Sequence, residues 1–126
     1  MKKQIISTKA APAAIGPYSQ AVRAGGAIYY SGQIPLIPET GEMVAGGIKE
    51  QTRQVLSNMR AMLQASALDY PAVVKTTIYL TDLADFAVVN ELYGACFEEA
   101  PPARACVQVA ALPKGAMVEI DWIAVA

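Results

Sequence analysis

The sequence predicts an α+β fold, in which a mixed β-sheet carries two helices on one of its faces. Two segments have apolar residues at helical steps of three and four, and segments with the alternating pattern of strands surround them. A length of 126 residues suffices for one domain, residues 1–126, and is too short for two. Apolar residues make up 54% of the chain and charged residues 17%, which is more apolar surface than a small monomer needs. We therefore expect a homo-oligomer that covers the free sheet face.

The N-terminal third predicts strands joined by turns. A short strand is expected near residues 3–7. A Gly-Pro turn and a Gly-Gly turn enclose the segment 15–26, and the aromatic and branched run 27–36 follows it, so the two segments predict a hairpin. Turn residues throughout 38–47 predict a loop.

Residues 48–68 predict the first helix, because apolar side chains recur there on one helical face. That face consists of Ile48, Thr52, Val55, Leu56, Met59, Met62 and Leu63. We interpret its methionines as core filling. The alternating run "AVVKTTIYL" (72–80) then predicts a strand in which Val74, Thr76, Ile78 and Leu80 share a face.

The C-terminal third predicts a second helix and two more strands. The helix is expected over 81–99, with Thr81 or Asp82 as its N-cap. Its apolar stripe is Phe86, Asn90, Tyr93 and Phe97, so that one polar residue stands on the apolar face. Two prolines end the helix, and strands follow at 104–112 and 117–125 around a "PKGA" turn.

Composition excludes several classes of function. The net charge is −1, the basic residues are scattered, and there is no apolar run of membrane-spanning length, so neither a nucleic-acid nor a membrane partner is expected. The start lacks the apolar segment of a secretory signal, and a cytoplasmic location is the default. There is no histidine and no CxxC pair, which removes the common zinc sites, Ser-His-Asp triads and Cys-His dyads. We expect no metal.

Arg104 is the first candidate for a functional residue, because it opens the small, apolar strand "RACVQVAAL", which has the composition of a buried strand. It is either an edge arginine paired with a nearby carboxylate or a planar fork that grips a carboxylate ligand. Cys106 lies on the same strand face, and it is a poor nucleophile candidate since only Arg104 is placed to lower its pKa.

Glu119 is the leading candidate for a general base in a chain without histidine. It is either solvated at a wet edge or partly desolvated, and in the second case its pKa rises towards neutrality. In a simple hairpin about "PKGA", Arg104 would face residue 125 and stand about 20 Å from Glu119. Either the two strands are not neighbours, or the two residues meet across a subunit boundary.

Other candidates come from short motifs. Tyr18 follows a Gly-Pro turn, and Ser31 precedes Gly32, so each hydroxyl lies beside a glycine that lets backbone approach a ligand. Each pattern also occurs in ordinary turns. Asn90 could bond a ligand or core backbone.

Taken together and in order, "AIGPYSQAV", "YSGQIP", "TGE", "ADFAVVNELYGACF" and "PARACVQVAALPKGAMVEIDWIAV" resemble the Rid family of reactive-intermediate deaminases, also called YjgF-like, over essentially the whole chain. The resemblance implies a chorismate-mutase-like fold, a homotrimer with ligand sites in the clefts between subunits, and no cofactor. It also implies hydrolysis of 2-imino acids, which pyridoxal-phosphate dehydratases form, to 2-keto acids and ammonia.

By motif, the resemblance makes Arg104 the carboxylate anchor and Glu119 the residue that positions or activates water. Tyr18, Ser31, Gly32, Asn90 and Cys106 then line the substrate site. Ala105 departs from the family, where serine or threonine is usual, and "FEEAPPAR" has the family's shorter form.

Two other functions remain open at this point. The chain could bind small carboxylates such as keto acids without turnover, using Arg104 alone. Ribonuclease or translational inhibition is a role of some relatives, and the acidic pI near 5.3 argues against it here.

Overall fold

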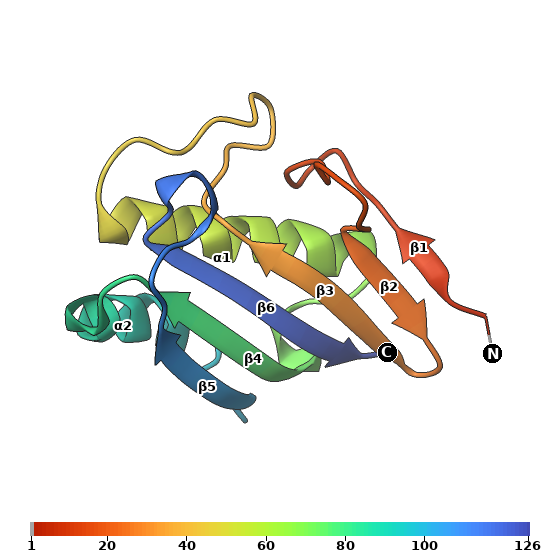
Figure 1. Ribbon diagram of the computed structural model, residues 1–126. Helices are drawn as coiled ribbons and strands as arrows, with labels where there is room; N and C mark the ends of the chain where they lie inside the picture. Colours follow the sequence, from red (N-terminus) through yellow and green to blue (C-terminus); the bar gives the residue numbers. More distant parts are fainter. Residues whose placement is uncertain (1) are drawn as a thin grey trace.

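The computed structural model describes residues 2–126, and its strands and helices follow the predicted order (Figure 1). The elements are β1 (Gln4–Ile6), β2 (Ala21–Ala24), β3 (Ala27–Gln33), α1 (Ile48–Ala65), β4 (Val73–Leu80), α2 (Phe86–Cys96), β5 (Ala103–Gln108) and β6 (Val118–Val125). Short 3₁₀ turns at Tyr70–Ala72, Leu83–Asp85 and Pro113–Gly115 connect some of them. The short strand near the N-terminus, the β2–β3 hairpin and the loop after β3 are confirmed.

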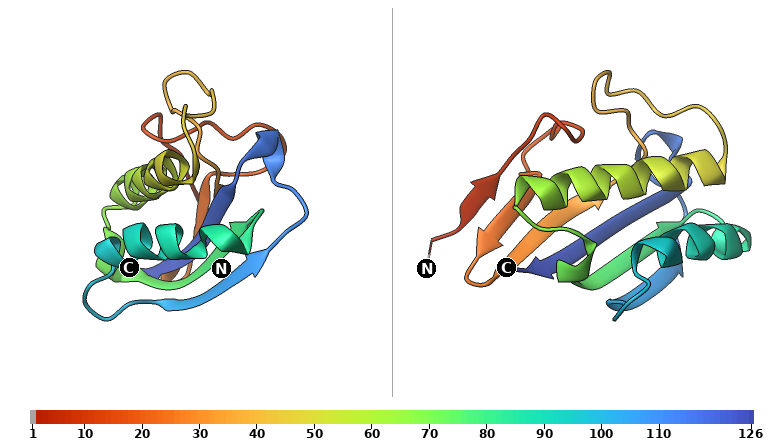
Figure 2. Two further views of the ribbon diagram at one scale, coloured as in Figure 1. Left: turned by 90° about the vertical axis from the view of Figure 1, so that its left-hand side faces the viewer. Right: turned by 180° about the vertical axis from the view of Figure 1, so that it is seen from behind.

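The six strands form one mixed sheet in the order β1-β2-β3-β6-β4-β5. Every neighbouring pair is antiparallel except β4 and β5, which are parallel because α2 forms the crossover between them. Both helices lie on the same face of the sheet (Figure 2), as predicted. Within residues 2–126, neither helix has the length and apolarity to span a membrane.

The topology shows that the first of the two alternatives for Arg104 and Glu119 holds, whereas the meeting of these residues across a subunit boundary stays a prediction. These strands do not form a hairpin, because β4 lies between them and pairs with both. The "PKGA" segment is therefore the turn at the end of a longer connection, with Lys114 in the left-handed region at φ 57°. Arg104 and Glu119 come from strands that are not adjacent.

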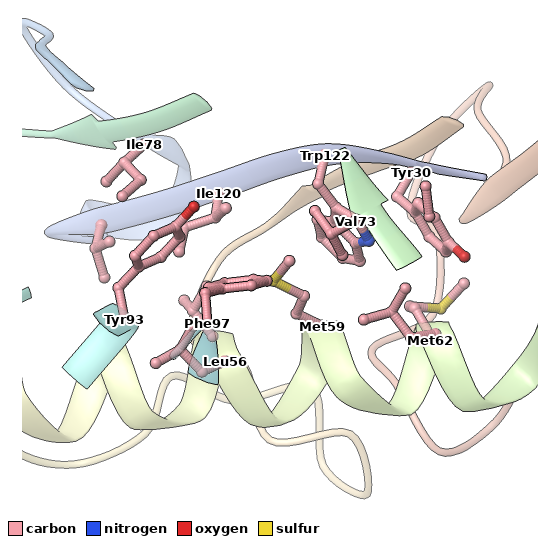
Figure 3. Close-up of a cluster of buried hydrophobic side chains, with 14 of the residues drawn as sticks. Tyr30, Leu56, Met59, Met62, Val73, Ile78, Tyr93, Phe97, Ile120 and Trp122 are labelled. Atoms are coloured by element: carbon pink, nitrogen blue, oxygen red, sulfur yellow. The ribbon is translucent and has the colours of Figure 1, made fainter. Parts of the chain in front are cut away.

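The core fills the space between the sheet and the helices (Figure 3). Met59 and Met62 of α1 are fully buried, which agrees with their interpretation as core filling. The Tyr30 and Trp122 rings stack above them with centroids 4.7 Å apart. Burial of such large apolar side chains contributes about 1.5–3 kcal/mol each, so this layer is the main source of stability.

Three elements differ from the predicted pattern. Val74 is exposed instead of sharing a face with Thr76, because the register of β4 against β6 shifts between Val73 and Lys75 and turns Val74 outwards. The second helix begins only at Phe86, after a 3₁₀ turn capped by Asp82, whose carboxylate accepts a hydrogen bond from Ala84 N–H at 2.9 Å.

The third difference concerns β5, which is not a buried strand. It is the edge of the sheet, it ends at Gln108, and only Cys106 among its side chains is partly buried. Small side chains suit an edge that α2 only partly covers. The apolar composition of "RACVQVAAL" therefore marks exposed apolar surface on this chain.

Candidate functional site: two clusters on opposite faces of the sheet

The cross-strand register places Arg104 and Glu119 on opposite faces of the sheet. Arg104 is level with Thr76 of β4, a fully buried residue on the face that the helices cover. Glu119 is level with Tyr79 of β4, which belongs to the open face. Directly paired residues point to the same side of a sheet. In one chain, the two candidate catalytic residues therefore cannot act on the same substrate.

Glu119 lies in a cavity of about 460 Å³, which we call the glutamate pocket. Tyr18, Ser31 and Gly32, three of the predicted site residues, line the same cavity. The remaining lining residues are Pro12, Ala13, Ile15, Gln20, Gln33, Ile34, Leu36, Pro113 and Lys114. Most of these are apolar, so the pocket provides a partly dry environment for one carboxylate and two hydroxyl groups.

The carboxylate of Glu119 is partly desolvated, which selects the second of its two predicted alternatives. Burial raises the pKa of Glu119 above its ordinary value of 4.5, and the charge of nearby Asp121 raises it further. Gly32 makes room for this carboxylate. A Cβ at position 32 would lie 2.9 Å from Glu119 Cδ and would overlap Oε2.

Asp121 is held in place by the neighbouring strand. The Tyr79 hydroxyl donates a hydrogen bond to Asp121 Oδ2 at 2.8 Å, and this bond together with burial raises the pKa of Tyr79. Because Tyr79 bonds Asp121, its hydroxyl proton is not offered to Glu119. The arrangement keeps two carboxylates on one face of β6, and the charge of Asp121 raises the pKa of Glu119.

The hydroxyl groups of the pocket have backbone partners. Ser31 Oγ donates to the Ser19 carbonyl at 2.6 Å, which leaves its oxygen lone pairs as acceptors. The Tyr18 hydroxyl accepts a long bond from Ile15 N–H at 3.3 Å, and half of the Tyr18 side chain is exposed. Tyr18 can therefore donate its proton to a ligand, whereas Ser31 is suited to accept.

Arg104 and Asn90 lie together at a second cavity, of about 450 Å³, beside α2. Arg104 Nη1 donates to Asn90 Oδ1 at 2.6 Å. The Arg104 guanidinium carbon lies 5.4 Å from the Phe86 ring centroid and 5.2 Å from that of Tyr93. We call Phe86, Asn90, Tyr93 and Arg104 the arginine cluster.

Arg104 is thus not the arginine of an ordinary surface ion pair. Within residues 2–126, the ion pair present is that of Arg60 with Asp69, at 3.1 Å. Asn90, for which the sequence left a ligand contact or a backbone contact open, accepts a hydrogen bond from Arg104 at its Oδ1, and its contact with a ligand stays a prediction. The guanidinium keeps its full charge and several free N–H groups.

Cys106 follows Arg104 on the same strand face and lines neither of these two cavities. Burial raises the pKa of its thiol above the ordinary value of 9.0, and the charge of Arg104 opposes the rise. The thiol is therefore protonated at neutral pH, in agreement with the expectation of a poor nucleophile.

No group of three His, Cys, Asp or Glu side chains within residues 2–126 has the arrangement of a metal site. The polar groups of the glutamate pocket are one carboxylate, two hydroxyls, amides and the ammonium of Lys114. This set suits a small polar organic molecule better than a cation, for which several oxygen ligands are usual.

Sequence reasoning missed Lys114 and the two aromatic rings. Lys114 lines the glutamate pocket, and its ammonium approaches the Gly41 carbonyl at 3.5 Å. The sequence feature that could have identified Lys114 is its position in the "PKGA" turn, just before the strand that carries Glu119. Phe86 and Tyr93 were interpreted as core stripe, although their spacing from Asn90 already placed all three on one side of α2.

Comparisons with known proteins agree with the motifs. The family described as Endoribonuclease L-PSP matches residues 8–126. Reactive Intermediate Deaminase A, chloroplastic, of Arabidopsis thaliana is 54% identical over 98% of this chain, which spans 66% of that protein's length. The 2-iminobutanoate/2-iminopropanoate deaminase of Mus musculus is 52% identical, over 98% of this chain and 91% of the mouse protein.

A solved structure shows the same architecture. The crystal structure of E. coli TdcF with bound serine superposes with a TM-score of 0.92 at 45% identity, covering 98% of each chain. The sequence and the fold therefore agree on one assignment. The chain belongs to the L-PSP family, which is the Rid or YjgF-like family that its motifs predicted.

Proposed function

We propose that this protein is a 2-iminobutanoate/2-iminopropanoate deaminase, which hydrolyses 2-imino acids to 2-keto acids and ammonia. About half of its residues are identical to those of deaminases from a plant and a mammal, over nearly its whole length. The observation that carries the proposal within the molecule is the desolvated Glu119 in the glutamate pocket. A protein that only bound carboxylate ligands would gain nothing from the carboxylate of Glu119 in its site, because the negative charges of Glu119 and the ligand repel each other.

Glu119 acts as the base towards water. As the water oxygen adds to the imine carbon, Glu119 takes one of its protons and the C=N double bond becomes a C–N single bond. Glu119 returns this proton to the nitrogen, which gives a tetrahedral intermediate with one hydroxyl and one amino group. The hydroxyl proton then passes through Glu119 to the nitrogen as the C–N bond breaks, so that the keto group forms and ammonia leaves. A raised pKa brings the carboxylate closer to the operating pH, where a general base is most effective.

Arg104 binds the substrate carboxylate through its planar fork. Bidentate, charge-assisted hydrogen bonds of this kind fix both position and orientation. Since an imine carbon is already electrophilic, the main tasks are to hold the substrate and to aim one water. Tyr18, Ser31, Gly32 and the strand around Cys106 complete the lining of the site.

We propose further that the protein is a homotrimer, with each site formed between two subunits. The opposite orientation of Arg104 and Glu119 supports this, because a neighbouring chain must then supply one of them. The open sheet face supports it too, since Tyr29, Val107 and Val125 expose 50%, 42% and 47% of their surface. Such apolar area is normally covered in an assembly.

The substrate class implies how the protein is used. Enzymes with pyridoxal phosphate that dehydrate serine or threonine release short-lived imino acids, so the proposed role is to speed the hydrolysis of these products.

The cytoplasmic location expected from the sequence stays a prediction. Although the family description includes endoribonuclease, a net charge of −1 does not favour binding to a polyanion.

The proposal is tested by coupling the protein to threonine dehydratase. The imino acid is trapped with semicarbazide, and the release of 2-oxobutanoate is followed at the same time. We expect the protein to decrease semicarbazone formation and to accelerate keto-acid release. Unchanged trapping, combined with normal binding of 2-oxobutanoate, would identify the protein as a carboxylate-binding protein instead.

A further inference from the structure

The strongest unexplained feature is the set of neutral groups that surrounds Arg104. Phe86, Asn90 and Tyr93 occur at positions i, i+4 and i+7 of α2, so they form one stripe of the helix facing β5. The stripe contains an amide and two aromatic rings. A carboxylate is absent from it, although acidic residues are the usual partners of arginine.

Each contact holds the guanidinium without neutralising it. A guanidinium only donates hydrogen bonds, so Asn90 must present its carbonyl oxygen, and at 2.6 Å this uses one of five N–H groups. The Phe86 and Tyr93 rings attract the cation through their faces and carry no charge. The electrostatic attraction between Arg104 and an incoming carboxylate is therefore retained.

A second layer fixes the stripe. The Tyr93 hydroxyl shares a hydrogen bond of 2.7 Å with Thr76 Oγ1, and both groups are buried. Thr76 is the strand partner of Arg104 in the β4–β5 ladder. One residue of β4 therefore anchors both the strand that bears Arg104 and the ring that packs against it, which restricts the rotamers of a long side chain.

We infer that Asn90, together with Phe86 and Tyr93, is a positioning residue that orients Arg104 for a carboxylate while leaving its charge unpaired. The neutral side chain at position 90 is then the essential property. An aspartate of the same shape would form an ion pair with Arg104 and compete with the ligand. This inference rests on the proposed function only for the identity of the ligand.

The test compares two substitutions at position 90 in the full-length protein. Asn90→Asp keeps the shape and adds a charge, whereas Asn90→Ala removes the hydrogen bond and adds none. Ala87→Asp adds the same charge at an exposed position of α2 outside the stripe. The measurements are KM and kcat for imine hydrolysis, the Kd of 2-oxobutanoate by calorimetry, and the thermal unfolding midpoint.

We expect Asn90→Asp to raise KM and Kd by about 30-fold and Asn90→Ala by about fivefold, with kcat within about twofold of wild type. Ala87→Asp is expected to behave as wild type. A purely structural role gives the reverse order, because the isosteric aspartate disturbs packing less than alanine. Equal KM and Kd values for wild type and Asn90→Asp, or a larger effect of Asn90→Ala, would overturn the inference.

The two readouts separate this inference from the proposed function. If wild type binds 2-oxobutanoate but does not accelerate imine hydrolysis, the deaminase proposal fails, and the Kd series alone decides the role of Asn90. If wild type shows neither binding nor turnover, both proposals are wrong. If turnover is present and the three variants share one KM, only the positioning role of Asn90 is wrong.

Discussion

The glutamate pocket and the arginine cluster treat their central charges in opposite ways. Glu119 is partly buried among apolar side chains and stands near a second carboxylate, so its charged form is disfavoured. Arg104 is exposed and touches only neutral partners, so its charge stays fully available. The first environment suits a group that exchanges a proton, and the second suits a group that binds an anion. Among the residues that the structure describes, the glutamate pocket contains no arginine to bind an anion, and the arginine cluster contains no carboxylate to act as a base.

The largest expected effect comes from the glutamate pocket. Glu119→Gln keeps the shape and removes the base, and general-base catalysis contributes about 10²–10⁴-fold to a rate. We therefore expect kcat to fall at least about 100-fold, while KM changes little because Arg104 still binds the carboxylate. Steady-state kinetics with semicarbazide trapping measure both. Glu39→Gln, at an exposed loop position, is the matched control. A variant that retains most of its kcat would show that Glu119 is not the base.

The arginine cluster should give an effect of similar size, seen mainly in KM. Arg104→Ala removes two charge-assisted hydrogen bonds of about 1.5–3 kcal/mol each, which corresponds to at least about 100-fold in kcat/KM. Arg104→Lys keeps the charge and loses the fork, so we expect a loss of about tenfold. Arg53→Ala on the exposed side of α1 controls for the loss of one cation. Equal activity of the Lys and Ala variants would contradict bidentate binding.

Gly32→Ala tests the close approach of backbone to Glu119. The added Cβ overlaps the carboxylate, which is the flexible end of its side chain, so Glu119 shifts and the fold is retained. We expect about a tenfold fall in kcat, with an unfolding midpoint within a few degrees of wild type. Gly26→Ala is the control, since its Cβ would meet no atom within 4 Å. Wild-type kcat in Gly32→Ala would mean that the carboxylate position is not critical.

The smallest effect is a shift in pH dependence. An ionised Glu119 is required, so activity is lost as pH falls through its pKa, and burial and Asp121 place that pKa above 4.5. Asp121→Asn removes the charge contribution, so the acidic limb of kcat should move to lower pH. Tyr79→Phe leaves the Asp121 charge in place and should give a smaller shift. All variants are measured on one substrate, so that the ionisation of the substrate affects each pH profile equally and does not contribute to the difference between them. A limb that moves to higher pH in Asp121→Asn would contradict this electrostatic account.

Most of the fold follows from local patterns in the sequence. The helical period of Val55, Met59 and Met62 depends on a few neighbouring residues, and so does the alternation along β4. The first appears in the structure, and the second appears from Lys75 onwards. The edge position of β5 is different, because it depends on which strands pair over long distances. An apolar composition indicates burial in general and does not tell whether a helix of the same chain or another copy of the chain provides it.

The sequence allowed the candidate residues to be identified, but it did not allow their positions relative to one another to be predicted. Glu119 and Arg104 stood out because a chain without histidine has few other groups for acid–base or anion-binding chemistry. Their placement on opposite faces required the register of β4 against both β5 and β6. The role of Asn90 also required the structure, since its partner is 14 residues away in sequence and lies on another element.

We propose that Arg104 of one subunit and Glu119 of another serve the same substrate. The most direct test mixes Arg104→Ala and Glu119→Gln chains by unfolding and refolding them together, and measures imine hydrolysis. Each parent alone lacks one half of every site. In randomly mixed trimers, about a quarter of the sites combine an intact arginine with an intact glutamate, so we predict recovery of about a quarter of wild-type activity. If the mixture is as inactive as its parents although mixed trimers have formed, the shared site is wrong.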